Sequence, residues 1–325
     1  MGSRPEDNGT RCGLWSSPRD DAYRCATIIV IKRATAAFSL IGCIFMLLMI
    51  WLLRKYNSLA QKMIFSLTVA AFFDSIAYVM GDAGPDGALC NFQAWWLTYF
   101  DWSALAWVCC ITLNLYLNVV KKMRTEQFER AYHATAWGMP FVLSCLPLFG
   151  DYYGPAGAWC WITNEHAAWR FAIWYVPLFI LIFLMMLCYL RIVYVAKQRV
   201  LLVEEIKPLK WYPCVYLAVT FFPLLNRLHN AVSPNNPSFL LLVLHVVSAP
   251  LHGLANAIVF GLDKETWVQL HFSSLQLAFQ SRFCDKTRIK EYRPRNVQYM
   301  TQSTDEDSDS CDDTTELFSL KDQGP

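Results

Sequence analysis

The sequence predicts an all-α membrane protein: a bundle of seven transmembrane helices with its amino terminus outside. Of the 325 residues, 55% are hydrophobic and 17% are charged, whereas soluble domains carry about 25% charged residues. A soluble globule of this composition would expose large apolar patches and aggregate. Seven segments are long and apolar enough to cross a bilayer, and Lys and Arg gather in alternate loops between them. The main solvent of this chain is therefore expected to be lipid.

The seven spans follow from runs of about 20 mainly apolar residues. Membrane strands would instead alternate apolar and polar residues over about 10 positions, and these runs are continuous. The first is expected at 34–53, with a start as early as Thr27. The other six are expected at 63–81, 92–120, 132–150, 169–196, 211–229 and 238–262. Residues 27–262 therefore form the expected bundle.

The orientation follows from the positive-inside rule. Loops 54–62, 121–131 and 197–210 together hold eleven Lys and Arg, and the alternate loops hold none. Lys32 and Arg33, on the outer flank of the first span, weaken the signal there. The later loops place residues 1–26 outside the cell as an amino-terminal segment and place the tail in the cytosol.

A short amphipathic helix is expected over 263–284, after the seventh span. Its apolar residues recur at helical spacing, which is typical of a helix lying on the inner leaflet. Cys284 stands between Arg282 and Lys286. It is a candidate for palmitoylation, and a free cytosolic thiol is the alternative.

Residues 285–325 are expected to be a disordered acidic tail. Kinases acting there would add docking charge, and the candidate phosphorylation sites are Ser303, Ser308, Ser310 and Thr314. At the other end of the chain, Asn8 begins the sequence Asn-Gly-Thr on the expected outer side, where it is a candidate glycosylation site.

Two cysteine pairs stand on the expected outer side. Cys90 begins the third span and Cys160 lies in the loop after the fourth. A disulfide between them would tie that loop across the mouth of the bundle. Cys12 and Cys25 form either a second bridge or two free thiols. The other cysteines lie mostly in spans, where a small side chain simply packs.

Four segments together resemble one family. They are LNLYLNVVKK (113–122), WGMPFV (137–142), AWCWI (158–162) and VLHVVSAPLHGLANAIVFG (243–261). Over residues 34–265 the chain resembles the slime-mould cyclic-AMP-receptor-like (class E) group of G-protein-coupled receptors, which includes animal orphan members. The resemblance implies a receptor that binds an extracellular ligand and activates a heterotrimeric G protein. It implies a cyclic nucleotide only through some slime-mould members.

Ionisable residues at membrane depth must be paired or face water. Asp101 lies about 16 Å deeper than Cys90 at 1.5 Å per residue, and Arg227 lies in the outer half of the sixth span. One hypothesis is that they line an outward ligand pocket. The alternative is that Asp101 pairs with Arg227 or with a neighbouring hydroxyl. The full set expected at this pocket is Trp95, Trp96, Asp101, Trp161, Arg227 and His245.

The seventh span places His245, His252 and Asn256 on one helical face. With Asp74 of the second span, they are expected to form a polar core that couples the pocket to the cytosolic side. A zinc hydrolase would need paired His at i, i+4 or a third nearby ligand, so no metal is expected. The span contains no Lys for a retinal Schiff base.

Pro223 interrupts the sixth span, which is expected to let its inner half swing outward and open a cytosolic cleft. A static kink is the alternative. The basic residues expected to rim the cleft and face a G protein are Lys121, Lys122, Arg191, Lys197 and Lys210. Contact with anionic lipid head groups is their other expected role.

The function expected is that of a receptor with no catalytic residue, no cofactor and no nucleic-acid partner. Its expected partners are an extracellular ligand, a heterotrimeric G protein, membrane lipid, and kinases and an arrestin-like protein at the tail. Its expected location is the plasma membrane, with the ciliary membrane as an alternative. A multi-pass transporter or channel is the competing hypothesis, although the two halves of the chain show no repeat of the kind many transporters carry.

Overall fold

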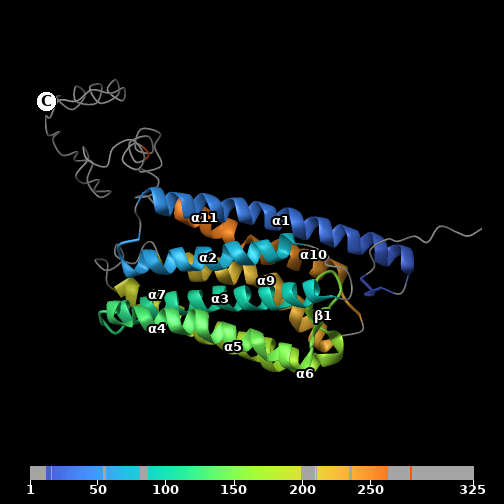
Figure 1. Cartoon of the computed structure of the whole chain (residues 1–325). Helices are drawn as coiled ribbons and strands as arrows, with labels where there is room; N and C mark the ends of the chain where they lie inside the picture. The colour runs from blue at the N-terminus through green and yellow to red at the C-terminus, as the bar shows by residue number, and fades with distance from the viewer. Residues whose placement is uncertain are drawn as a thin grey trace, which may run out of the picture.

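The computed structural model of the chain describes residues 12–15, 17–53, 56–80, 87–198, 209, 211–233, 236–262 and 279. Within these ranges the chain is almost entirely helical, with one short β-hairpin. Figure 1 shows long helices side by side, their axes roughly parallel, and the hairpin at one end. We name this the hairpin end. The helical class expected from the sequence is confirmed.

Some expectations concern residues outside these ranges. They are the glycosylation of Asn8, the amphipathic helix 263–284 with Cys284, the acidic tail with its phosphorylation sites, and the role of Lys210.

The first three helices are α1 (Pro18–Leu52), α2 (Leu59–Val79) and α3 (Ala88–Val119). α1 begins well before the expected span 34–53, so part of the segment 1–26 is helical. Pro18 stands at the first helical positions, and Asp20 and Asp21 in the first turn favour a helix amino terminus. α2 begins at a capping box, in which Ser58 and Gln61 each accept the other's backbone N–H through a side-chain oxygen.

The next part of the chain is a helical run from Glu126 to Gly150, broken into short elements. They are a 3₁₀ turn (Glu126–Phe128), α4 (Glu129–His133), a π-helical segment (Ala134–Gly138), α5 (Met139–Cys145) and a second 3₁₀ turn (Leu146–Gly150). Asp151, at φ 52°, ends the run in the left-handed region.

The hairpin follows this run. β1 (Tyr153–Pro155) pairs antiparallel with β2 (Cys160–Ile162), with Tyr153 opposite Ile162. The chain then re-enters the bundle through a 3₁₀ turn (Asn164–His166), α6 (Ala167–Arg170), a π-helical segment (Phe171–Tyr175) and α7 (Val176–Gln198).

The last helices are α9 (Trp211–Val232), with Pro223 inside it, and the pair α10 (Phe239–Ser248) and α11 (His252–Leu262). A 3₁₀ turn over Ala249–Leu251, containing Pro250, joins α10 to α11 without a break.

By length and composition, five segments of the described chain could cross a membrane. They are Arg19–Leu52, Leu59–Val79, Ala88–Val119, Ala168–Lys197 and Phe239–Gly261. The expected fourth and sixth spans fall in the run Glu126–Gly150 and in α9. Both are helical but less apolar, and α9 carries Asn226, Arg227 and His229 in its second half. The count of seven spans and the orientation therefore stay predictions.

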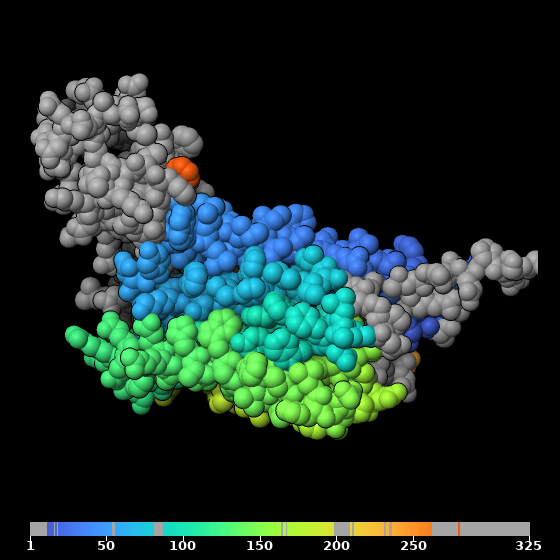
Figure 2. All heavy atoms as spheres, in the orientation of Figure 1, coloured from blue at the N-terminus to red at the C-terminus, as the bar shows by residue number. Residues whose placement is uncertain are grey.

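α3 is the central helix. It packs against α2, α5, α7, α9 and both strands of the hairpin, and its Trp102 and Trp107 have no exposed surface. Figure 2 shows one long side of the bundle, on which α1, α2 and α3 are followed by the run that contains α4 and α5. Large apolar side chains on the outside of α1 and α7, such as Phe38 and Phe183, are more than half exposed. A lipid environment would cover them.

A close approach fixes α1, α2 and α11 to one another. The Ser39 hydroxyl oxygen lies 3.1 Å from that of Ser75 and accepts the backbone N–H of Gly253 at 3.0 Å. A Cβ on Gly253 would lie 2.1 Å from Sγ of Cys43, and one on Gly42 would lie 2.9 Å from the backbone of Leu254. Only glycine lets α1 and α11 come this close.

Candidate functional site

A disulfide and buried contacts hold the hairpin against the bundle. Cys90, at the start of α3, is joined to Cys160 of β2, and their Cα atoms are 5.4 Å apart. The Tyr153 hydroxyl donates to the carbonyl oxygen of Ser144 at 2.8 Å, and burial raises the pKa of Tyr153 well above its ordinary value. Cys12 and Cys25 are also joined, which is the bridged alternative for that pair.

The hairpin tip reaches α1 and α10. The ammonium of Lys32 donates to the carbonyl oxygen of Ala158 at 3.0 Å, and the Trp159 ring meets the ring of His245 edge-on at 5.6 Å. Lys32 has no exposed surface, so it lies under the hairpin rather than on a wetted flank. The sequence offered no sign of this, because the contact joins residues far apart in the chain.

β2 meets α9 through one aromatic ring. The Arg227 guanidinium carbon lies over the Trp161 ring, 4.2 Å from its centroid. The guanidinium carbon of Arg170 lies 5.1 Å from the same centroid, and Arg170 also donates to the carbonyl oxygen of Ile162 at 2.7 Å. Trp161 further contacts Trp174 and Tyr175. Two of the expected pocket residues, Trp161 and Arg227, are therefore in direct contact.

Asp101 does not form an ion pair with Arg227 within the described chain. The guanidinium of Arg227 instead lies over the rings of Trp161 and Tyr175. A direct pair with Arg227 was one of the alternatives left open for Asp101, and the described part of the chain does not contain it. The ring of Trp161 in β2 lies against the Arg227 guanidinium instead.

Trp95 and Trp96 have other neighbours. Trp95 stacks on Tyr99 at 5.8 Å and packs with the base of the hairpin. The Trp96 indole N–H donates to the carbonyl oxygen of Phe73 at 2.8 Å. Among the described residues, no ring contact joins either of them to Trp161 or Arg227.

A buried polar core lies behind these contacts. The side-chain nitrogen of Asn226 is 3.0 Å from Nδ1 of His245, and both residues are buried. His252 stacks on Tyr216, with ring centroids 5.1 Å apart. Asp74, His252 and Asn256 are buried as well. Within the described chain, Oδ1 of Asp74 and both ring nitrogens of His252 have no hydrogen-bond partner.

Asn226 was not predicted as a member of this polar core. The sequence did hold a signal, because an amide side chain three residues after Pro223, in a segment expected to cross the membrane, needs a polar partner. No three His, Cys, Asp or Glu residues of the described chain are grouped so that they could hold a metal ion.

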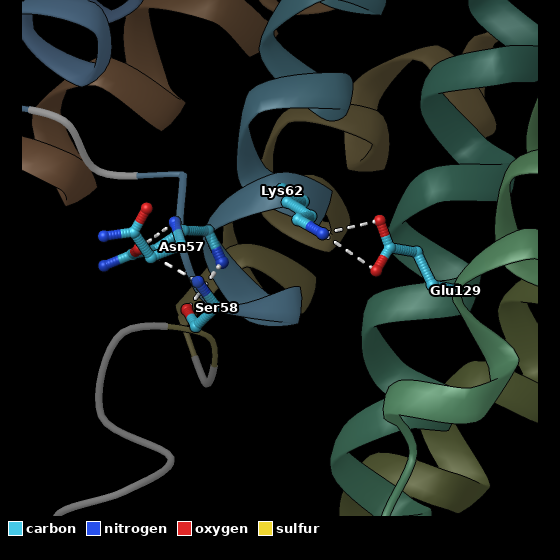
Figure 3. Close-up of polar contacts among 5 residues, drawn as sticks. Asn57, Ser58, Lys62 and Glu129 are labelled. Carbon is cyan, nitrogen blue, oxygen red and sulfur yellow. Dashed lines mark hydrogen bonds and ion pairs between the residues drawn. The ribbon is translucent and has the colours of Figure 1, made fainter.

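At the end opposite the hairpin, an ion pair joins α2 to α4. Figure 3 shows Lys62 reaching toward Glu129, whose two carboxylate oxygens lie 2.8 and 2.9 Å from the ammonium nitrogen. This pair was not foreseen. The basic residues expected to face a G protein are exposed where the structure describes them, at Lys121, Lys122, Arg191 and Lys197. Lys122 has a φ of 55°, in the left-handed region.

The chain is similar to known receptors along most of its length. A family model described as "Slime mold cyclic AMP receptor" matches residues 19–306. Cyclic AMP receptor-like protein A of Dictyostelium discoideum is 24% identical over 233 residues, which are 71% of this chain and 63% of that protein. G-protein coupled receptor 1 of Arabidopsis thaliana is 26% identical over 313 residues, or 90% of this chain and 93% of that protein.

A human protein, G-protein coupled receptor 157, is 25% identical over 240 residues, which are 63% of this chain and 71% of that protein. The match to the slime-mould receptor-like protein spans less than two thirds of that protein, whereas the match to the plant receptor spans nearly all of it. Because the family model covers most of the sequence, the chain belongs to the slime mold cyclic AMP receptor family.

Proposed function

We propose that this chain is a seven-helix G-protein-coupled receptor of the plasma membrane. It binds an extracellular ligand at the hairpin end and activates a heterotrimeric G protein at the opposite end. The run Glu126–Gly150 and α9 serve as the fourth and sixth spans, and the amino terminus lies outside. We assign it no catalytic residue.

The contact of Trp161 with Arg227 carries this proposal. It couples the hairpin, which the Cys90–Cys160 disulfide anchors to α3, to the second half of α9. A ligand that enters beside Trp161, Arg227 and His245 would compete for the same guanidinium and imidazole groups. Its binding would therefore change the forces on α9 and α10 directly. In this proposal the buried polar residues Asp74, His252 and Asn256 would carry the change toward the opposite end.

Pro223 supplies the weak point in α9. It lies one turn before Arg227 and removes a backbone hydrogen bond inside the helix. A ligand that prefers the arrangement with the far half of α9 moved outward shifts the population toward it. The cleft that opens would be rimmed by Lys121, Lys122, Arg191, Lys197 and Lys210, which would contact the G protein or anionic lipid.

The remaining segments are assigned supporting roles. The segment 263–284 lies on the inner leaflet as an amphipathic helix, with Cys284 as its lipid anchor. Kinases and an arrestin-like partner act on the tail 285–325, and Asn8 carries a glycan outside. Cyclic nucleotides are the first ligands to test, because several relatives are named cyclic AMP receptors.

The test is energy-transfer sensing of Gα–βγ dissociation across a panel of Gα subunits in cells that express the full chain. The wild type is compared with Lys121→Ala/Lys122→Ala at equal surface level. Arg19→Ala, an exposed charge at the other end of the bundle, is the control. The proposal is supported if Gα–βγ dissociation is lost in the double variant and retained in Arg19→Ala. Silence across the panel with ample surface protein contradicts it, and G-protein-independent substrate uptake would instead favour a transporter or channel.

A further inference from the structure

The loop of residues 12–15, before α1, is fastened to a single carboxylate. All four of its backbone N–H groups donate to Asp21, at 3.0, 3.0, 2.9 and 3.1 Å. Gly13, at φ 64°, provides the left-handed turn that aims successive N–H groups at one anion. Asp21 is 3% exposed, and the disulfide of Cys12 with Cys25 closes the loop against α1. The loop is therefore held in one shape.

The same loop lies between the hairpin and α10 and contacts both. Leu14 lies against the hairpin tip, because a Cβ on Gly157 would come within 3.3 Å of its methyl group. The Trp15 ring meets Phe239 of α10 edge-on at 5.9 Å, and Arg24 lies over both rings. Leu14 and Trp15 pack on a buried cluster formed by Cys25, Ile28, Ile29, Ala158, Leu242 and Val246.

The hairpin tip that the loop presses on is the part that covers the bundle. Ala158 accepts the hydrogen bond from Lys32, Trp159 contacts His245, and the same hairpin carries Trp161 onto Arg227. A continuous series of contacts therefore runs from the loop through the hairpin to α9 and α10.

We infer that residues 12–15 are a built-in stopper that keeps the hairpin closed over this end of the bundle and restrains signalling. The second half of this inference rests on the proposed function. Contacts made only in the closed arrangement stabilise that arrangement, so removing them moves the population toward one with the hairpin lifted. The partner of the hairpin tip is thus a segment of the chain itself, and an external ligand has to displace it.

The first measurement needs no signalling. The full-length protein in lipid nanodiscs is treated with a membrane-impermeant, amine-reactive reagent, and the labelling of Lys32 is measured by mass spectrometry. Lys62, which is 39% exposed at the other end, serves as the internal reference. Lys32 should stay unlabelled in the wild type, because the closed hairpin covers it.

Two variants should release the stopper. Asp21→Ala removes the acceptor of all four N–H groups, and Cys12→Ser/Cys25→Ser removes the covalent closure; each should raise Lys32 labelling at least fivefold. Arg19→Ala is the control, because Arg19 is an exposed charged residue of the same helical turn. Protection of Lys32 in both releasing variants would overturn the inference.

Leu14→Ser provides a test that remains valid if those two variants fail to fold. It keeps Asp21 and the disulfide and removes only the apolar contact with the hairpin tip. It should give a smaller but clear rise in Lys32 labelling. A Leu14→Ser protein that is labelled like the wild type would show that the loop does not hold the hairpin.

The second measurement is basal Gα–βγ dissociation at equal surface level. Asp21→Ala should at least double the basal signal, and Arg19→Ala should leave it unchanged. In cells where the wild type signals, a variant that exposes Lys32 and leaves basal signalling unchanged would overturn the role of residues 12–15 in restraining signalling. If no variant gives Gα–βγ dissociation, and the wild type gives none either, the proposed function is contradicted. The labelling of Lys32 alone then tests whether residues 12–15 hold the hairpin closed.

Discussion

Arg227 of α9 lies over the ring of Trp161 in β2, with 4.2 Å between the guanidinium carbon and the ring centroid. This contact joins a loop that follows the fourth helical run to a helix that begins some fifty residues later in the chain. A cation–π contact of this kind contributes about 0.5–2 kcal/mol, depending on its exposure to water. The hairpin and α9 are therefore energetically coupled, and the coupling can be measured.

A double-mutant cycle of Trp161→Leu and Arg227→Gln should give a coupling energy of about 0.5–2 kcal/mol in thermal unfolding of the purified protein. Arg227→Lys should recover only part of it, because an ammonium stacks less well on an aromatic ring than a planar guanidinium does. Fully additive effects of the two single changes would show that the contact carries no energy.

The ion pair of Lys62 with Glu129 should be weak and sensitive to salt. Its side chains are 39% and 35% exposed, so solvent screening limits it to about 0.2–1 kcal/mol. Lys62→Ala and Glu129→Ala should each lower the unfolding midpoint slightly in dilute buffer, and the difference should shrink at 1 M salt. The charge swap Lys62→Glu/Glu129→Lys should restore the wild-type unfolding midpoint. Glu126→Ala, in the turn before α4, is the control, and an equal loss there would refute the pair's role.

Gly253→Ala should destabilise the seam between α1 and α11 by about 1–3 kcal/mol, since the new Cβ would lie 2.1 Å from Sγ of Cys43. Cys43→Ala in the same background should recover part of the loss by removing that sulfur. Gly261→Ala is the control on the same helix, because a Cβ there meets nothing within 4 Å. Unfolding midpoints that do not separate the two glycine variants would disprove the close approach.

Asn226→Ala should leave the ring of His245 without its buried partner, at a cost of about 1–3 kcal/mol. Asn226→Leu combined with His245→Phe should be much closer to the wild type, since neither polar group then remains to be satisfied. Asn230→Ala, one turn further along α9 and only half-buried, should have little effect. Thermal unfolding distinguishes these cases, and equal losses for Asn226→Ala and Asn230→Ala would contradict the prediction.

Apolar length was enough to predict the helices that pass through the middle of the bundle, but not their ends. Hydropathy placed the first helix at 34–53, because Asp20, Asp21 and Lys32 lower the apolar average before it. The helix nevertheless begins at Pro18, since a proline and acids in the first turn favour helix in water as much as in lipid. The breaks within the run Glu126–Gly150 fall at Gly138, Pro140 and Pro147, residues that a count of apolar length does not weigh.

The candidate site was predicted in its residue types more than in its contacts. Trp161, Arg227 and His245 were recognised because charged and aromatic groups at membrane depth need partners. The partners themselves depend on packing: Lys32 and Ala158 are separated by 126 residues, and Lys62 and Glu129 by 67. No local pattern encodes such pairs. For Asp101 the sequence left a ligand pocket, Arg227 and a neighbouring hydroxyl open, and it gave no sign that Arg227 would lie over the ring of Trp161.

The π-helical segment Phe171–Tyr175 sets where Arg170 points. A π segment holds one more residue than the α-helical turn it replaces, and each residue turns an α-helix by about 100°. Deleting one residue there would rotate α6 about the axis of α7 and carry Arg170 away from Trp161, with every side chain otherwise unchanged. Relatives that differ by a single insertion or deletion in this segment would therefore present a different charge to the hairpin, so alignment gaps here carry as much functional meaning as substitutions.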